Sequence, residues 1–121
     1  MTSADQETAR PAPEDLRVRT HPVLGDLPPA PEVTIFVDGR PIPARAGEPI
    51  AAALLASGIR VCRTMPRSRQ PRGVFCGVGR CTDCAMTVDG EPNVRTCVTP
   101  VRDGQRIVTQ RGLGAWEEGT A

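Results

Sequence analysis

Three cysteines lie within the nine-residue stretch CGVGRCTDC (76–84), and a fourth follows in VRTCVTP. The full spacing is Cys76-x4-Cys81-x2-Cys84-x12-Cys97. Thiolates are soft ligands that bind zinc and iron–sulfur clusters, and a short loop brings several of them to one place. The first chemistry to consider for this sequence is therefore metal binding, and the spacing decides which inorganic group fits.

A 2Fe–2S cluster is favoured over zinc and over disulfides. Structural zinc sites usually combine two separated Cys-x2-Cys pairs or mix cysteine with histidine, whereas this chain has one such pair and a single, distant histidine, His21. Disulfides need an oxidising compartment, which nothing in the sequence indicates. A Rieske centre needs two histidines and is excluded by the count. Cys-x4-Cys-x2-Cys with a later fourth cysteine is the plant-type 2Fe–2S spacing.

The residues around these cysteines fit the same group. Gly77 and Gly79 allow the backbone to fold closely and to turn N–H groups toward the sulfurs. The fifth cysteine, Cys62, is expected to be a small buried apolar residue and not a ligand. Six arginines and no acidic residue lie between the expected helix and Cys81, which indicates either a solvated basic loop or a charged rim that tunes the cluster and meets an acidic partner. These are Arg60, Arg63, Arg67, Arg69, Arg72 and Arg80.

A β-hairpin is predicted at the start of the ordered part, in EVTIFVDGRPIPAR (32–45). Apolar residues alternate along its first half, which is a strand pattern, and Asp38-Gly39 is a strong two-residue turn. The second strand holds Pro41 and Pro43, whose missing N–H groups fall on the same side. We therefore expect this strand at the edge of a sheet.

One helix and further strands complete the expected domain. GEPIAAALLASG (47–58) predicts a helix with Pro49 in its first position, because proline suits helix starts and alanine favours helix. Residues 59–75 are expected to be irregular. A second hairpin is predicted at 84–98, and a last strand within 101–110. This order predicts a small α+β domain with a mixed sheet around one main helix.

Three parts are expected along the chain of 121 residues. Residues 1–31 are rich in proline, alanine and acidic groups and predict a disordered or extended arm. Within it, RVRTHPVLG (17–25) is either a plain linker or a segment that docks onto the domain or onto a partner. Residues 32–111 form the predicted domain, and residues 112–121 a mobile tail.

Composition limits the functional class. A net charge of +1 gives no signal for nucleic acid, and no apolar run is long enough to span a bilayer. The N-terminus lacks the pattern of a secretion signal, so a cytoplasmic location is expected. The sequence shows no Ser–His–Asp set, no paired carboxylates in a plausible cleft and no nucleotide-binding glycine motif. We therefore expect no catalysis by this chain alone.

The sequence resembles a known group of proteins in FCGVGRCTDCAMTVDGEPNVRTCVTPVRDG (75–104), preceded by VDGRPIPARAGEPIAAALLASG (37–58). These segments are similar to the 2Fe–2S-binding small subunits of bacterial flavin-dependent amine and amino-acid dehydrogenases. That group includes hydrogen cyanide synthase, opine oxidases and D-hydroxyproline dehydrogenases, and a related segment opens the large subunit of heterotetrameric sarcosine oxidase. The resemblance covers about residues 32–111 and implies a β-grasp, ferredoxin-like fold. It also implies one 2Fe–2S cluster whose ligands are Cys76, Cys81, Cys84 and Cys97.

By resemblance, the chain is an electron-transfer subunit in a hetero-oligomer with a flavoprotein that contains FAD and oxidises C–N bonds of amines, imino acids or opines. A stand-alone 2Fe–2S ferredoxin and a cluster-based redox sensor are the alternatives. Free plant-type ferredoxins place the fourth cysteine much further along the chain and are usually strongly acidic. The iron–sulfur subunits of molybdenum hydroxylases and succinate dehydrogenases have a second cluster domain with more cysteines. The C-terminal tail either docks onto a partner through Leu113 and Trp116 or is disordered.

Overall fold

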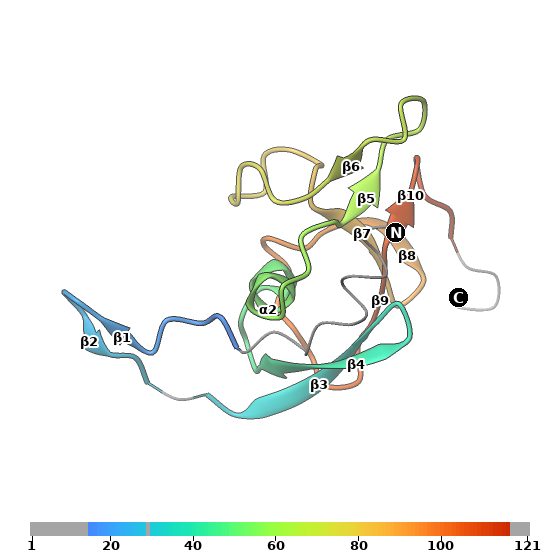
Figure 1. The fold of residues 1–121 in the computed structure, drawn as a ribbon. Helices are drawn as coiled ribbons and strands as arrows, with labels where there is room; N and C mark the ends of the chain where they lie inside the picture. Colours follow the sequence, from blue (N-terminus) through green and yellow to red (C-terminus); the bar gives the residue numbers. More distant parts are fainter. Residues whose placement is uncertain (1–14, 29, 117–121) are drawn as a thin grey trace, which may run out of the picture.

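A curved five-stranded sheet wraps around helix α2 (Ile50–Ala56) (Figure 1). The computed structural model describes residues 15–28 and 30–116. Strand β9 runs parallel to β3, and the other neighbours in the sheet are antiparallel, so the sheet is mixed as predicted. The order across the sheet is β4 (Arg40–Arg45), β3 (Glu32–Val37), β9 (Arg106–Val108), β7 (Ala85–Val88) and β8 (Glu91–Arg95).

Both predicted hairpins are present. Asp38 and Gly39 have φ angles of 49° and 85°, and Asp89 and Gly90 have 49° and 86°. Positive φ at both central residues defines a type I′ turn, whose twist matches that of the two strands it joins. Strand β4, with its two prolines, lies at the edge of the sheet, which confirms the expectation from the missing N–H groups.

Helix α2 (Ile50–Ala56) lies against the concave side of the sheet (Figure 1). It is shorter than the predicted segment, and Pro49 is its N-cap residue and not its first helical residue, because the Pro49 backbone is extended (φ −62°, ψ 145°). The predicted inner face is confirmed, since Ile50, Ala53 and Leu54 are buried. They pack in one cluster with apolar residues of the central strands and with three cysteines.

The segment expected to be irregular contains two short strands. β5 (Arg63–Thr64) pairs with β6 (Pro71–Arg72) and with β10 (Gln110–Arg111), which forms a second, small sheet. A pair of two-residue strands has almost no periodicity to read, and its pairing depends on β10, which is distant in the sequence. The predicted last strand is therefore divided: β9 belongs to the main sheet and β10 to the small one.

Part of the N-terminal arm is attached to the domain. The Leu16 N–H donates to the Ala56 carbonyl oxygen over 3.0 Å, and the Arg17 guanidinium binds the Glu48 carboxylate. Beyond this attachment, β1 (Thr20–His21) and β2 (Gly25–Asp26) form a small hairpin that projects from the body (Figure 1). Of the predicted arm (1–31), residues 1–14 and 29 lie outside the described residues.

Candidate metal centre

The loop of residues 76–84, here the cysteine loop, lies between β6 and β7 and extends to the left side of Figure 1. Cys84 directly precedes β7, and Cys97 follows two residues after the end of β8. Ala85 pairs with Arg95, so the open end of this hairpin places the two cysteines next to each other. The buried Thr96 hydroxyl donates to the Cys84 carbonyl oxygen over 2.7 Å and fixes this end.

Backbone N–H groups surround the sulfur of Cys76. The N–H groups of Val78 and Arg80 donate to Cys76 Sγ over 3.4 Å and 3.3 Å. The intervening Gly77 and Gly79 have φ angles of 72° and 78°, which other residues rarely adopt, and these angles turn the N–H groups inward. The N–H groups of Val78, Arg80 and Cys81 stabilise the thiolate and lower the pKa of Cys76 to about 6.

The four predicted thiols form two interacting pairs. The Cys76 side chain interacts with that of Cys81, and the Cys97 side chain with that of Cys84. The charge of Cys76 also acts on Cys97, which shows that the two pairs are neighbours. Burial, followed by the interaction with Cys84, raises the pKa of Cys97.

The thiols and the N–H groups near them are the kinds of group that an iron–sulfur cluster needs. Among residues 15–28 and 30–116, no group of three His, Cys, Asp or Glu side chains lies close enough together to hold a metal ion. A 2Fe–2S cluster needs four thiolates, two for each iron, and hydrogen bonds to its sulfurs. Two adjacent thiol pairs with N–H groups pointing at sulfur supply that donor set.

Cys62 lies behind this site in the core. Its side chain is buried, and burial raises its pKa from 9.0 to about 11. It interacts with Thr96 and is near Cys84 and Cys97, but it belongs to the apolar cluster under the helix. The expectation of a buried, apolar cysteine is confirmed.

The arginines of the expected charged rim are not equivalent. Five are exposed, but Arg63 on β5 is buried, with an exposed fraction of 6%. In the sequence, Arg63 looks like the other arginines, because a two-residue strand gives no pattern that shows which side chain points inward. The exposed five are Arg60, Arg67, Arg69, Arg72 and Arg80.

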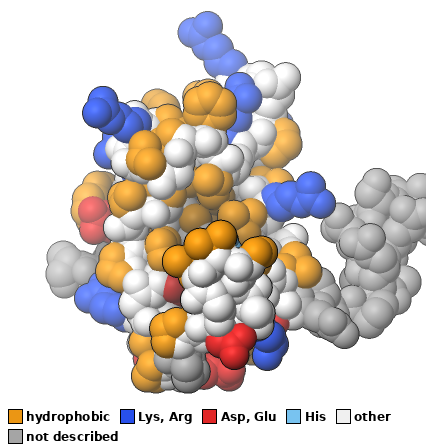
Figure 2. All heavy atoms as spheres, turned by 90° about the vertical axis from the view of Figure 1, so that its left-hand side faces the viewer, with side chains coloured by type: hydrophobic (Ala, Val, Ile, Leu, Met, Phe, Trp, Pro, Cys, Tyr) orange, Lys and Arg blue, Asp and Glu red, His pale blue; other side chains and the backbone are white. Residues whose placement is uncertain are grey.

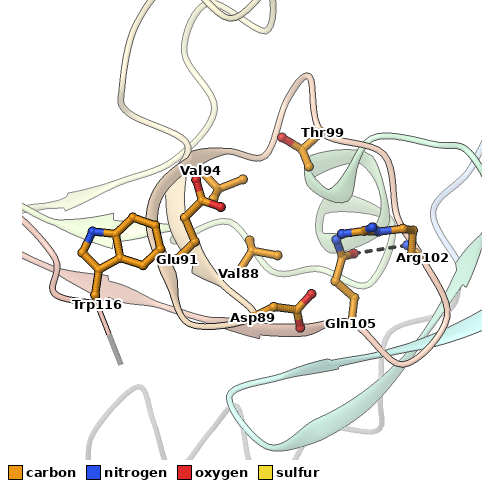
Figure 3. A pocket seen from close by; sticks show the side chains of 8 residues that line it. All are labelled: Val88, Asp89, Glu91, Val94, Thr99, Arg102, Gln105 and Trp116. Carbon is orange, nitrogen blue, oxygen red and sulfur yellow. Dashed lines mark hydrogen bonds between the residues drawn. The ribbon is translucent and has the colours of Figure 1, made fainter. Parts of the chain in front are cut away.

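A separate open cavity of about 260 Å³ lies at the other end of the β7–β8 hairpin (Figure 3). Asp89 and Glu91 at the hairpin turn border it, and Cys84 and Cys97 lie at the opposite end of the same strands. The cavity is therefore distinct from the thiol pairs. Its lining residues are Val88, Asp89, Glu91, Val94, Thr99, Arg102, Gln105 and Trp116.

Comparison with known proteins places this geometry in a family. Residues 30–112 match the family model described as the 2Fe-2S iron-sulfur cluster binding domain. That range contains the whole main sheet, α2 and all five cysteines. The chain belongs to this 2Fe–2S family. Its cofactor is thus a 2Fe–2S cluster, and the predicted α+β fold is the fold of a 2Fe–2S domain.

Two relatives of the 2Fe–2S domain have the same name, hydrogen cyanide synthase subunit HcnA. The protein from Pseudomonas aeruginosa is 39% identical over 87 residues, which are 72% of this chain and 83% of the relative. The one from Pseudomonas protegens is 32% identical over 78 residues, 64% of this chain and 73% of the relative. The predicted resemblance to hydrogen cyanide synthase subunits is confirmed.

A solved structure with a similar fold is the crystal structure of L-proline dehydrogenase from P. horikoshii. The TM-score is 0.62 at 30% sequence identity, over 74% of this chain. The 2Fe–2S domain spans only 17% of that chain, so the likeness concerns one part of a larger protein. In the described residues of the 2Fe–2S domain, no helix has the length and hydrophobicity needed to cross a bilayer.

Proposed function

We propose that this chain is the 2Fe–2S electron-transfer subunit of a heteromeric, flavin-dependent dehydrogenase or oxidase that acts on C–N bonds of amines, imino acids or opines. The observation behind the proposal is the double pair of thiols at the open end of the β7–β8 hairpin, in a chain related to hydrogen cyanide synthase subunits and similar in part to an L-proline dehydrogenase. The proposed ligands are Cys76, Cys81, Cys84 and Cys97.

The residues of this chain hold the cluster, shield one side of it and present the other. A 2Fe–2S cluster, when bound, supplies one-electron transfer, which complements the two-electron oxidation of a C–N bond by a flavin in a partner. The N–H groups of Val78 and Arg80 stabilise the negative charge on Cys76. Cys84 and Cys97 are buried against the core, whereas Cys76 and Cys81 are partly exposed. The exposed side of the cysteine loop is the side from which electrons would enter or leave.

Apolar side chains around the cysteine loop support a partner on this side. Phe75 and Val78 are 80% and 67% exposed, and Val98, whose side chain lies beside Gly79 of the loop, is also exposed. Figure 2 shows hydrophobic side chains gathered on the face that includes the left side of Figure 1, with arginines at its upper edge. Exposed apolar groups beside a redox centre are typical of a protein interface. We propose that the FAD-containing subunit covers this rim.

The ligand assignment is tested by single Cys→Ser variants of the full chain. Serine at position 76, 81, 84 or 97 should abolish or strongly change the visible 2Fe–2S spectrum. Cys62→Ser is the matched control, since that thiol lies in the core and should leave the spectrum intact. A Cys62→Ser variant that loses its colour beside a Cys97→Ser variant that keeps it would refute the assignment.

The complex is tested by purifying the chain from its native source under anaerobic conditions. Flavin absorbance beside the 2Fe–2S bands, with larger subunits at fixed stoichiometry, would support the proposal and lead to substrate screening with amines, imino acids and opines. A chain that purifies alone with its cluster would instead indicate a stand-alone ferredoxin.

The interface is tested by comparing two exposed aromatic residues. Phe75→Glu should reduce co-purification with the flavoprotein subunit at least tenfold while the 2Fe–2S spectrum stays unchanged, because a charge replaces an apolar contact. Trp116→Glu should have little effect, because Trp116 borders the cavity at the far end of the β7–β8 hairpin. The reverse result would place the interface at the C-terminal segment.

The remaining sequence-based expectations stay proposals. We keep the division into an arm (1–31), a domain (32–111) and a tail (112–121). The start of the tail is bonded to the domain, since the Asn93 side chain donates to the Leu113 carbonyl oxygen over 3.1 Å, and residues 117–121 lie outside the described residues. We also propose a cytoplasmic location, which suits five cysteines that form no disulfide in the structure.

A further inference from the structure

Arg63 is a buried arginine that lacks an acidic partner in the described part of the chain. Its exposed fraction is 6%, and none of the ion pairs found there includes it. A guanidinium remains charged at all physiological pH values. Because an uncompensated buried charge is strongly unfavourable, a structure that keeps one needs a source of negative charge nearby.

The contacts of Arg63 lead to the cysteine loop. Nη1 donates to the carbonyl oxygen of Thr82 over 3.1 Å, and Nη2 donates to that of Gly112 over 2.7 Å. Thr82 lies between Cys81 and Cys84, so the guanidinium joins the loop to the end of the small sheet. Arg63 Nε is buried and has no hydrogen-bond partner within residues 15–28 and 30–116. Two neutral carbonyl groups orient the guanidinium but do not neutralise it.

We propose that Arg63 is a positioning residue for the 2Fe–2S cluster, which fixes the segment between Cys81 and Cys84 and offsets the negative charge that the cluster and its thiolates bring. The inference rests on the proposed ligation by the four cysteines. A 2Fe–2S cluster with four thiolates has a net charge of about −2, and about −3 after it accepts one electron. A fixed positive charge beside it favours the more negative, reduced state and thereby raises the reduction potential.

Burial separates Arg63 from the other arginines of this region. Charges in contact with water are screened by solvent and salt, whereas a buried charge acts through a medium of lower dielectric constant. Arg67 is exposed and belongs to the same segment between α2 and the cysteine loop. It is therefore the matched control: it has the same charge and a similar place in the chain, but it is in water.

The test uses the full chain purified with its cluster, in four forms: wild type, Arg63→Gln, Arg63→Lys and Arg67→Gln. Glutamine retains one N–H donor group without the charge, and lysine retains the charge without the two-pronged geometry. The readouts are the visible absorbance and circular dichroism of the 2Fe–2S centre, its midpoint potential by spectroelectrochemical titration, and the rate of cluster loss to a chelator.

We expect Arg63→Gln to have a more negative midpoint potential than wild type. The midpoint potentials of Arg63→Lys and Arg67→Gln should stay close to that of wild type. Cluster loss should be several-fold faster in Arg63→Gln than in Arg67→Gln. If Arg63→Gln cannot retain a cluster while Arg63→Lys can, this result also supports the inference, because it shows that the cluster needs a positive charge at this position. Equal potentials, or equal rates of cluster loss, in Arg63→Gln and Arg67→Gln would overturn the inference. A wild-type chain without a 2Fe–2S spectrum would overturn the ligand assignment as well.

Discussion

Gly73 shows how closely the backbone is packed where it enters the cysteine loop. A Cβ atom at this position would lie 2.1 Å from the carbonyl oxygen of Arg60, which is far inside van der Waals contact. The neighbouring Arg72 carbonyl oxygen accepts the Cys62 N–H over 2.8 Å, so the two segments are held together and have little freedom to separate. Only glycine fits between them.

Replacing Gly73 with alanine should therefore destabilise the domain. We expect a loss of about 2–4 kcal/mol in the free energy of unfolding, because the added methyl group meets backbone and not a flexible side chain. Urea unfolding and the absorbance of the 2Fe–2S centre measure the effect. Gly47→Ala is the control, since Gly47 has a positive φ but open space around it. A Gly73→Ala variant as stable as wild type would show that the two segments can separate enough to admit the methyl group.

The Cys62 thiol should make the stability of the cluster-free protein depend on alkaline pH. Burial raises its folded-state pKa from 9.0 to about 11. A group whose pKa is higher in the folded state stabilises that state fully below the unfolded pKa and loses this contribution as the pH rises through the folded pKa. Stability should thus fall between about pH 9 and pH 11, by at most about 3 kcal/mol for a shift of this size.

Urea unfolding of the cluster-free chain at several pH values between 8 and 11 checks this expectation. Below pH 9, Cys62→Ala should lower stability by about 1 kcal/mol through the lost packing. It should also make the decline with pH shallower than in wild type. An identical slope in both proteins would mean that other groups cause the alkaline decline.

At the scale of elements, α2 and the cysteine hairpin support each other. The first N–H groups of a helix have no partner within it. Here the Ile50 and Ala51 N–H groups donate to the carbonyl oxygens of Thr99 and Thr96, over 2.8 Å and 3.0 Å. These two residues flank Cys97, so the helix start fixes the segment that presents this thiol. The position of α2 therefore matters for the proposed cluster, although no helix residue is a proposed ligand.

Leu54→Ala should consequently destabilise both the fold and the cluster. Leu54 is 1% exposed in the core, and removing a buried leucine side chain costs about 2–5 kcal/mol. Leu55, its neighbour, is 43% exposed, and Leu55→Ala should cost less than about 1 kcal/mol. Denaturant unfolding measures the stability of the fold, and the rate of cluster loss to a chelator measures the stability of the cluster. Equal rates of cluster loss would show that the helix does not control the thiol segment.

The sequence was most informative where local chemistry decides the structure. The Asp38-Gly39 and Asp89-Gly90 turns, the edge position of the proline-containing strand and the inner face of α2 all follow from short-range rules, and the structure confirms them. The cysteine spacing likewise predicted the 2Fe–2S family, because four positions must agree.

Features that depend on contacts between distant segments were missed. The small sheet of β5, β6 and β10 has two residues in each strand, and it joins positions almost fifty residues apart. The burial of Arg63 depends on that sheet and on the carbonyl oxygens of Thr82 and Gly112. No local pattern separates a buried arginine from five exposed ones nearby, so only the tertiary structure shows the difference.

At the scale of the whole molecule, the arm and the cysteine loop extend toward the same side. The β1–β2 hairpin and the loop both reach the left side of Figure 1, and both contribute to the face in Figure 2. Val23 and Leu24 at the hairpin tip are exposed. The arm is held in this direction mainly near Arg17, whose side chain contacts the carboxylates of Asp15 and Glu48. A partner that covers this whole side would contact both the cysteine loop and the arm.

Removing the Arg17 side chain should release the arm without unfolding the domain. Arg17→Ala breaks the attachment to Glu48, and we expect at most about 2 kcal/mol of lost stability, because the pair is partly buried and hydrogen-bonded. Hydrogen exchange followed by mass spectrometry should become several-fold faster over residues 16–27 and stay unchanged in the main sheet.

Arg19→Ala is the control, because Arg19 is exposed and its contact with Asp15, at 3.9 Å, is weak. If both variants leave exchange in the arm unchanged, the Leu16 hydrogen bond and the backbone alone hold it. If Arg17→Ala alone speeds exchange in the arm and also weakens co-purification with the flavoprotein subunit, the attached arm is part of the interface.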